Sequence, residues 1–232
     1  MLSIILTSFN RPALLKKAVQ SVLNQTESQL QLIIADDNSS KPEVDEIIAL
    51  AAKDPRVFAW KSSVSDEDRP KQVRPSIMIN ESYQYVKGDL VFYLCDDCWM
   101  FPNCAQVVED FFNANPQANG AYCIQELKWV DMSTGQELDK GITYRGDYGK
   151  PLTKAFCAVD HSQVFHRKTM LDRGLRWGTN PFNWKAPDGI TFDKLIELGG
   201  PLYFIPKVLV GYYFHVHNLS RSDPTKVESF RW

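Results

Sequence analysis

The sequence predicts an α/β fold in which a mostly parallel β-sheet carries helices on both faces. In the first half of the chain, apolar runs of strand length alternate with segments whose apolar residues recur at helical spacing. These runs are predominantly apolar and do not alternate with polar residues, as in strands buried on both faces. Segments containing Asp, Asn or Ser follow three of the runs. Parallel strands bring such segments to one edge of the sheet, where α/β folds bind ligands.

Each element of the first half has its own signal. Apolar runs predict strands at residues 2–8, 30–37, 56–60 and 89–97. Helical spacing predicts helices at residues 11–26, 41–54 and 75–88. Pro12 and Pro42 lie near the starts of the first two helices, and Gly88 closes the third. The polar segment 63–75 lacks periodicity and is a predicted loop.

The second half is less regular. It predicts a helix at 103–116, strands at 120–132 and 142–146, a strand entering a helix at 155–170, a helix at 187–200 and two short strands within 201–218. Asp188 is the expected N-cap of the helix at 187–200. We expect one continuous domain whose two halves, residues 1–98 and 99–232, join near residues 98–103.

Composition and charge narrow the class of protein. A net charge of −2 gives no reason to expect a nucleic-acid or anionic-membrane partner. No apolar run reaches the ~20 residues of a transmembrane segment, and the short apolar N-terminus is expected to be a strand, not a signal peptide. The odd count of five cysteines favours a reducing cytoplasm over a disulfide framework.

The pair Cys95 and Cys98 has the spacing of a redox or zinc motif, but no second such motif supplies further ligands. We therefore expect the two cysteines to be small apolar fillers beside the aspartates that they enclose.

Two adjacent carboxylates, Asp96 and Asp97, end the strand at 89–97, with no basic neighbour in the sequence. Their mutual repulsion calls for a positive partner, and Mg²⁺ or Mn²⁺ suits oxygen ligands that are shared with substrate phosphates. The alternative is a solvated turn, since Asp is common in turns. The pair Asp36 and Asp37 has the same two interpretations, because the sequence that follows it favours a turn and a helix cap.

Glycine-rich loops that cradle phosphates are missing from the sequence. Phosphate charge would then be neutralised by a metal ion and by basic side chains on the same edge of the sheet, where the candidates are Arg11, Arg69, Lys71 and Arg74. For each of these side chains, the alternative is an ordinary solvated charge.

Segments 3–26, 32–40 and 88–103 together resemble the family 2 glycosyltransferases of the GT-A fold, including those of spore coat polysaccharide synthesis. The similarity continues at 155–167 and 187–200. The resemblance implies a Rossmann-like half that binds a nucleotide sugar (residues 1–98) and a half that binds an acceptor (residues 99–232). Segment 124–146 matches no pattern of the family, so the identity of the acceptor does not follow.

The resemblance also assigns roles to donor-side residues. Thr7 and Asp37 match positions that hold the nucleotide base and ribose, and Arg69 matches a basic residue near the base. Asp96 and Asp97 match the family's DXD-type motif. Asp97 is the expected ligand of Mn²⁺ or Mg²⁺, and Asp96 lies toward the ribose.

On the acceptor side, Asp188 matches the family's general base and Asp160 matches an aspartate of the acceptor region. His215 fits the histidine of an H-x-x-N-x-S segment better than His217 does, and is a candidate metal or phosphate contact. Its alternative is a packing histidine in an aromatic strand.

The implied activity is inverting transfer of a sugar from a UDP- or dTDP-sugar donor to an acceptor hydroxyl, in polysaccharide or glycoconjugate synthesis. The metal would stabilise the leaving diphosphate, and a carboxylate would take the acceptor proton. Two alternatives stay open. A nucleotidyltransferase would share the sheet and metal but needs a phosphate loop near the N-terminus. A non-catalytic carbohydrate-binding relative would rely on aromatic side chains such as Trp177 and Trp184.

Overall fold

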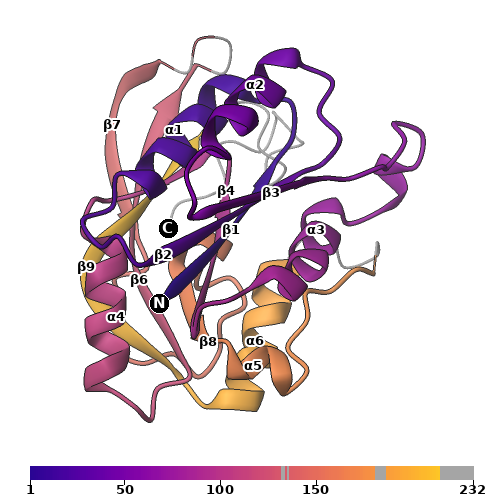
Figure 1. The fold of residues 1–232 in the computed structure, drawn as a ribbon. Coiled ribbons are helices and arrows are strands. Elements are labelled where there is room, and N and C mark those ends of the chain that lie inside the picture. The colour runs from indigo at the N-terminus through magenta and orange to yellow at the C-terminus, as the bar shows by residue number, and fades with distance from the viewer. Residues whose placement is uncertain (132–133, 135, 181–186, 215–232) are drawn as a thin grey trace, which may run out of the picture.

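The computed structural model describes all residues except 132–133, 135, 181–186 and 215–232, which Figure 1 draws in grey. Within the described residues, nine strands form one curled sheet with helices packed on both of its faces. This confirms the predicted α/β class.

The first half forms the parallel part of the sheet. β1 (Leu2–Ser8) lies between β2 (Leu30–Asp36) and β4 (Leu90–Cys95), and β3 (Val57–Lys61) pairs with β2 at the edge. The connections contain the helices α1 (Pro12–Leu23), α2 (Pro42–Ala51) and α3 (Arg74–Ser82). Every residue of β1 and β2 is buried, as their apolar runs predict.

The second half extends the same sheet in mixed directions. It contains β5 (Cys98–Met100), α4 (Cys104–Ala114), β6 (Gly120–Val130), β7 (Glu137–Arg145), β8 (Val164–Arg167), α5 (Thr169–Asp172), α6 (Pro187–Gly199) and β9 (Leu202–Phe214). The strand order is β3-β2-β1-β4-β8-β6-β9-β5, and β7 pairs with β6. β8 runs antiparallel to both β4 and β6, so it joins the two halves.

The core has two layers, one on each face of the sheet. On one face, apolar residues of α1, α2 and α4 pack against Ile4, Leu32 and Phe92. On the other face, residues of α3, α5 and α6 pack against Ile5 and Tyr93. Alternate residues of a strand point to opposite faces, so a strand needs apolar residues at every position to fill both layers.

Several elements differ from the predictions. The strand predicted at 142–146 begins earlier, at Glu137, as β7, and the short strand β5 was not predicted. The third helix ends at Ser82 and continues as a short 3₁₀ turn, Tyr83–Tyr85, before Gly88. The predicted loop at 63–75 contains a 3₁₀ turn at Arg69–Lys71. The two short strands predicted within 201–218 are one long strand, β9, because two register shifts against β6 accommodate the segment around Pro206.

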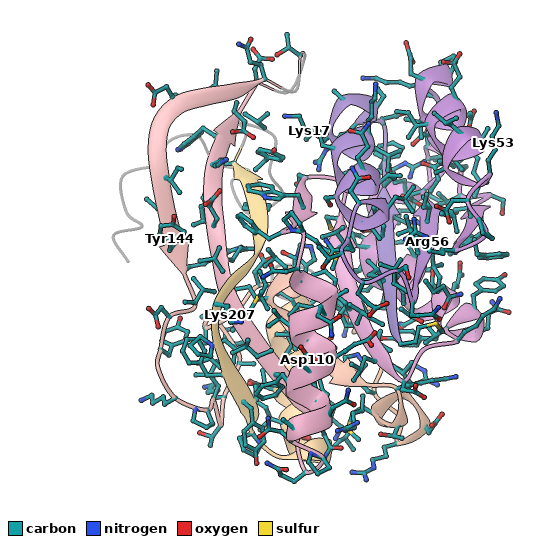
Figure 2. All side chains as sticks on the ribbon, turned by 60° about the vertical axis from the view of Figure 1, so that its left-hand side comes forward. Lys17, Lys53, Arg56, Asp110, Tyr144 and Lys207 are labelled. Carbon is teal, nitrogen blue, oxygen red and sulfur yellow. The ribbon has the colours of Figure 1, made fainter. Side chains whose placement is uncertain are left out.

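The β6–β7 ribbon projects beyond the rest of the sheet, with β7 as its outer strand (Figure 2). Tyr144 on β7 is 56% exposed. The last residue of β7, Arg145, lies at the base of the ribbon, where it reaches the site described next.

Candidate functional site

The carboxyl ends of β1, β2 and β4 meet at one edge of the sheet. Thr7 lies opposite Cys95 in the β1–β4 register, and Ser8 lies opposite Asp36 in the β1–β2 register. The N–H of Asp96 donates to the carbonyl of Thr7 (3.1 Å), and the N–H of Asp37 donates to that of Ser8 (2.9 Å). The predicted convergence of the three polar segments is therefore confirmed. We call this edge the donor rim.

The Asp96–Asp97 pair has a basic partner, Arg11, the residue that precedes α1. Arg11 Nη1 lies 3.0 Å from Asp96 Oδ1 and 3.0 Å from Asp97 Oδ2. The Asp96 and Asp97 side chains are only 5% and 8% exposed. Burial raises the pKa of Asp96 to about 6 even though Arg11 favours its ionised form. The sequence analysis found no basic neighbour for this pair and named Arg11 only as a candidate phosphate contact, whereas the structure places Arg11 on the pair itself.

The two aspartates of the Asp36–Asp37 pair do different things. Asp36 is fully buried and accepts hydrogen bonds from the backbone N–H (2.9 Å) and hydroxyl (2.5 Å) of Ser39. It forms the turn, as one interpretation of the sequence predicted. The Asp37 carboxylate instead pairs with Arg69 and Arg74, with Arg74 Nε 2.8 Å from Asp37 Oδ1.

Arg69 stacks on the Phe9 ring and pairs with the Asp37 carboxylate on the donor rim. Its guanidinium lies 3.9 Å from the centre of the Phe9 ring, and it also donates to the Asp37 carbonyl (2.5 Å). The structure thus brings Arg69 beside Asp37, as expected if both face one nucleotide. Among the described residues, the buried Arg69 Nε and the neighbouring Ser8 Oγ have no hydrogen-bond partner.

Thr7 lies on the same rim, 8% exposed, with its hydroxyl 3.4 Å from Cys95 Sγ. All five cysteines are free thiols. Cys98 is buried, as a small filler would be, but its thiol also donates to Ser162 Oγ (3.4 Å), so it is not a purely apolar filler.

A second charged cluster lies next to the donor rim. Ligand atoms of Asp160, His161 and Asp188 lie within 4.8 Å of one another. Arg145 Nη2 is 2.8 Å from Asp160 Oδ2, and His161 Nδ1 is 3.0 Å from Asp160 Oδ1. We call these four residues the acceptor-side cluster. Asp160, His161 and Asp188 would also fit a metal ion as ligands. Arg145, however, already gives the Asp160 carboxylate a positive partner.

The cluster changes the pKa of each titratable member. Burial alone would raise the pKa of Asp160, but Arg145 and His161 lower it well below 3.8. Burial opposes protonation of His161, yet Cys95 and Asp160 raise its pKa well above 6.5. Burial and then the negative charge of Asp160 raise the pKa of Asp188 above 3.8. Asp188 is thus the most basic carboxylate of the cluster.

The prediction that Asp188 is a helix N-cap was wrong. α6 begins at Pro187, so Asp188 lies in the first helical turn and its Oδ1 accepts the N–H of Gly189 (2.9 Å). Pro187 explains the shift, because proline is favoured at the first helical position. A carboxylate in the first turn is also favoured by the helix dipole.

Asp160 is the N-cap that the sequence analysis missed. It starts the short 3₁₀ turn His161–Gln163 in a capping box with Gln163. The D-x-x-Q pattern of residues 160–163 was the available signal. Arg145 was also missed. It comes from a segment that matches no family pattern, and no local signal places it beside Asp160.

Cys98 connects the donor rim to the acceptor-side cluster. Its Sγ lies 3.5 Å from Asp97 Oδ1 and 4.0 Å from His161 Nε2. Cys98 thus lies between Asp97 and His161. The predicted contact from His215, with its alternative His217, lies outside the described residues.

A sequence profile of glycosyl transferase family 2 matches residues 3–170. The chain belongs to this family. Its fold is the GT-A fold: the structure of Staphylococcus aureus TarS 1–349 in complex with UDP-GlcNAc matches it with a TM-score of 0.71, covering 96% of this chain and 61% of that TarS chain at 11% identity.

Two further proteins are similar to this chain in sequence. Protein CgeD of Bacillus subtilis is 32% identical over 198 residues, which are 83% of this chain and 45% of CgeD. An uncharacterized glycosyltransferase of Nostoc is 21% identical over 196 residues, which are 79% of this chain and 55% of that protein. The chain thus spans about half the length of these relatives.

None of the helices within the described residues has both the length and the apolar character of a bilayer-spanning helix.

Proposed function

We propose that this chain is an inverting glycosyltransferase that moves a sugar from a UDP- or dTDP-sugar to an acceptor hydroxyl. The observation that carries the proposal is the contact of the Asp97 turn with the acceptor-side cluster through Cys98. A leaving diphosphate at Asp97 and a base at Asp188 would then lie on two sides of one reacting carbon. In-line displacement by an acceptor hydroxyl requires such an arrangement.

The donor rim would bind the nucleotide. Arg69, stacked on Phe9 and paired with Asp37, would lie near the base. Thr7 and Asp37 would contact the base and ribose, with Asp96 toward the ribose. The TarS structure was determined with UDP-GlcNAc, and its fold supports a nucleotide-sugar donor for this chain.

Asp97 would hold Mn²⁺ or Mg²⁺. The donor set fits: two nearly buried carboxylates at a strand end face a single guanidinium, which leaves one net negative charge. Mg²⁺ commonly uses one or two carboxylates together with substrate phosphates. When bound, the ion would stabilise the negative charge that develops on the leaving diphosphate. His215 is a proposed further ligand.

Asp188 would remove the proton from the acceptor hydroxyl. Its raised pKa makes it a better base than the neighbouring Asp160, whose pKa Arg145 and His161 lower. Asp160 would position the acceptor. In this proposal residues 1–98 bind the donor and residues 99–232 bind the acceptor. We place the reaction in the cytoplasm, which five free thiols favour. Its product would be a polysaccharide or glycoconjugate.

The testing experiment measures nucleoside diphosphate release from UDP-GlcNAc and dTDP-sugars in Mn²⁺. Asp188→Asn keeps the shape of the side chain and removes the base, so kcat should fall by roughly 10²–10⁴ with little change in donor KM. Asp172→Asn, an exposed carboxylate on α5, is the matched control and should behave like the parent.

Near-normal turnover of Asp188→Asn would contradict the base assignment and move the test to Asp160. Release of pyrophosphate in place of a nucleoside diphosphate would indicate the nucleotidyltransferase alternative. Sugar binding with no release of either product would indicate a carbohydrate-binding relative.

A further inference from the structure

The contact between Arg11 and the two rim carboxylates has a consequence for how ligands enter the site. One atom, Arg11 Nη1, lies 3.0 Å from an oxygen of Asp96 and 3.0 Å from an oxygen of Asp97. The Arg11 side chain is 23% exposed, whereas the Asp96 and Asp97 side chains are 5% and 8% exposed, so the guanidinium is the most accessible group of the three. A cation that binds Asp97 would therefore meet the guanidinium first.

The backbone of this segment is fixed, whereas the side chain is long. The N–H of Asn10 donates to Ser39 Oγ (2.9 Å), and Asn10 Oδ1 accepts from the N–H of Ser40 (2.8 Å). The Arg11 carbonyl accepts the N–H of Leu15 in the first turn of α1 (2.9 Å). Arg11 can leave the carboxylates by side-chain rotation alone, without moving the backbone.

Charge balance shows why that departure depends on the donor. Two carboxylates and one guanidinium carry a net charge of −1. A divalent ion alone would change this net charge to +1. The ion and the guanidinium would then repel each other strongly, because the site is nearly dry. A diphosphate ester with two negative charges restores −1. It also gives the displaced guanidinium new acceptor oxygens, in the bidentate geometry that arginine favours.

We propose that Arg11 is a built-in counter-ion that makes binding of the metal ion and binding of the diphosphate mutually dependent. The inference rests on the proposed function, since it takes Asp97 as the metal ligand. In the ligand-free protein, Arg11 excludes the ion from Asp97. When the ion and the donor enter together, Arg11 moves from the carboxylates to the phosphates. The reciprocal coupling follows from thermodynamic linkage.

The test measures Mn²⁺ binding directly, from the electron paramagnetic resonance signal of the free ion, with and without saturating UDP. Mn²⁺ held by UDP alone is subtracted from a blank without protein. In the parent, UDP should tighten Mn²⁺ binding by a factor within the usual allosteric range, roughly 5–150-fold. In Arg11→Gln, Mn²⁺ alone should bind about tenfold more tightly, and the gain from UDP should fall by about the same factor.

Two control variants make the result specific. Lys16→Gln removes one positive charge from an exposed position of the same helix and should retain the parent's coupling. Asp97→Asn removes the proposed metal ligand and should abolish Mn²⁺ binding with and without UDP. Arg11→Lys keeps a positive charge but not the planar fork, and should keep Mn²⁺ alone weakly bound.

A thermal melt provides a second readout that does not depend on catalysis. Arg11→Gln leaves two buried carboxylates unbalanced, so its melting temperature in chelator should be lower than that of the parent. Mn²⁺ alone should restore the melting temperature of Arg11→Gln and change that of the parent little.

The outcomes separate the two hypotheses. In one outcome, Arg11→Gln binds Mn²⁺ no more tightly than the parent and UDP still increases its Mn²⁺ affinity by the full factor, while Asp97→Asn binds no Mn²⁺. The proposed role of Arg11 is then wrong, and the metal site at Asp97 stands. If the parent binds no Mn²⁺ in either condition and UDP binds equally well in chelator, the metal part of the proposed function is wrong, and the inference is wrong with it.

Discussion

Asp37 divides its two carboxylate oxygens between two guanidinium groups. Arg69 contacts one oxygen and Arg74 the other, and the three side chains are 9–15% exposed. Two positive charges on one negative charge leave a net attraction for an anionic ligand. The arrangement therefore suits a nucleotide, whose ribose can reach the carboxylate and whose phosphates favour the surplus positive charge.

Replacing Asp37 should affect nucleotide binding and stability together. Asp37→Ala should weaken binding of UMP or dTMP even in chelator, because the proposed contact is to the nucleoside and not to the metal. It should also cost up to about 3–5 kcal/mol of unfolding free energy, since it leaves two mostly buried guanidinium groups uncompensated. Calorimetric titration and urea denaturation measure the two effects.

The control for Asp37 is Asp66→Asn, because Asp66 contacts the same Arg69 at 3.5 Å but is 92% exposed. Asp66→Asn should change neither the free energy of nucleotide binding nor the free energy of unfolding by more than about 0.5 kcal/mol. Unchanged nucleotide affinity in Asp37→Ala would remove Asp37 from the binding site.

The positions of the rim residues could be predicted from the sequence, but their partners could not. Asp37, Asp96 and Asp97 follow apolar strands, and the rule that parallel strands share a carboxyl edge brings them together. The pairing of Arg11 with Asp97 spans 86 residues and depends on how α1 leaves β1, which local patterns do not encode. Arg145 is a similar case, because its position depends on the β6–β7 ribbon.

At the scale of elements, Arg167 links β8 to the C-terminal end of α4. Its Nη2 donates to the carbonyl of Phe112 (2.9 Å), and its Nε donates to that of Ala118 (2.8 Å). Its guanidinium also lies over the Phe112 ring, 5.2 Å from the centre. The last carbonyls of a helix lack partners within the helix, so Arg167 satisfies one of them from outside.

Arg167→Lys should lower the unfolding free energy by roughly 1.5–3 kcal/mol, because one ammonium cannot reach both carbonyls and each charge-assisted bond contributes about that much. Guanidinium chloride denaturation measures the change. Arg173→Lys, which alters a single exposed bond to the Leu198 carbonyl, should stay close to the parent. Equal midpoints for the two variants would show that Arg167 is not a structural link.

Elements of the first half were easier to predict than those of the second, for a physical reason. Strands buried on both faces are apolar at every position, and the helices between them have one buried stripe each. β9 deviates because its bulges around Pro206 interrupt the pattern without ending the strand. Every residue of β7 before Arg145 is exposed, so its apolar content carries little information on pairing.

At the scale of the whole molecule, a buried chain of polar groups crosses the core layer of α3, α5 and α6. The hydroxyls of Tyr83 and Tyr93 lie 2.8 Å apart, and the Tyr93 hydroxyl lies 2.7 Å from His166 Nε2. His166 Nδ1 lies 2.9 Å from the Arg167 carbonyl and so acts as the donor there. Burial lowers the pKa of His166 from 6.5 to about 4, so the imidazole is neutral in the folded protein.

His166 should make the fold acid-sensitive. Between pH 6.5 and about 4 the unfolded chain binds a proton at this histidine and the folded protein does not. Above pH 6.5 His166 is neutral in both states and does not lower the unfolding free energy. As the pH drops from 6.5 towards 4, proton binding by the unfolded chain lowers the unfolding free energy by at most about 1.4 kcal/mol per pH unit. Urea midpoints of the parent and of His166→Gln across this range measure the contribution.

The comparison with His166→Gln isolates this histidine, because carboxylates such as Asp96 titrate in the same range in both proteins. The variant should lose stability less steeply than the parent as the pH falls. Parallel curves for the two proteins would show that His166 keeps an ordinary pKa.

The turn that carries Asp96 and Asp97 is fixed at both ends by different strands. β4 ends at Cys95 beside β1, and β5 begins at Cys98 paired with β9. The backbone of the turn itself is bonded to Thr7 on one side and to Tyr213 on the other, where the Tyr213 N–H donates to the Asp97 carbonyl (2.8 Å). The conformational entropy of these two residues is therefore lost when the sheet forms. A ligand that arrives later encounters carboxylates that are already in place, and its affinity is not reduced by the ordering of a loop.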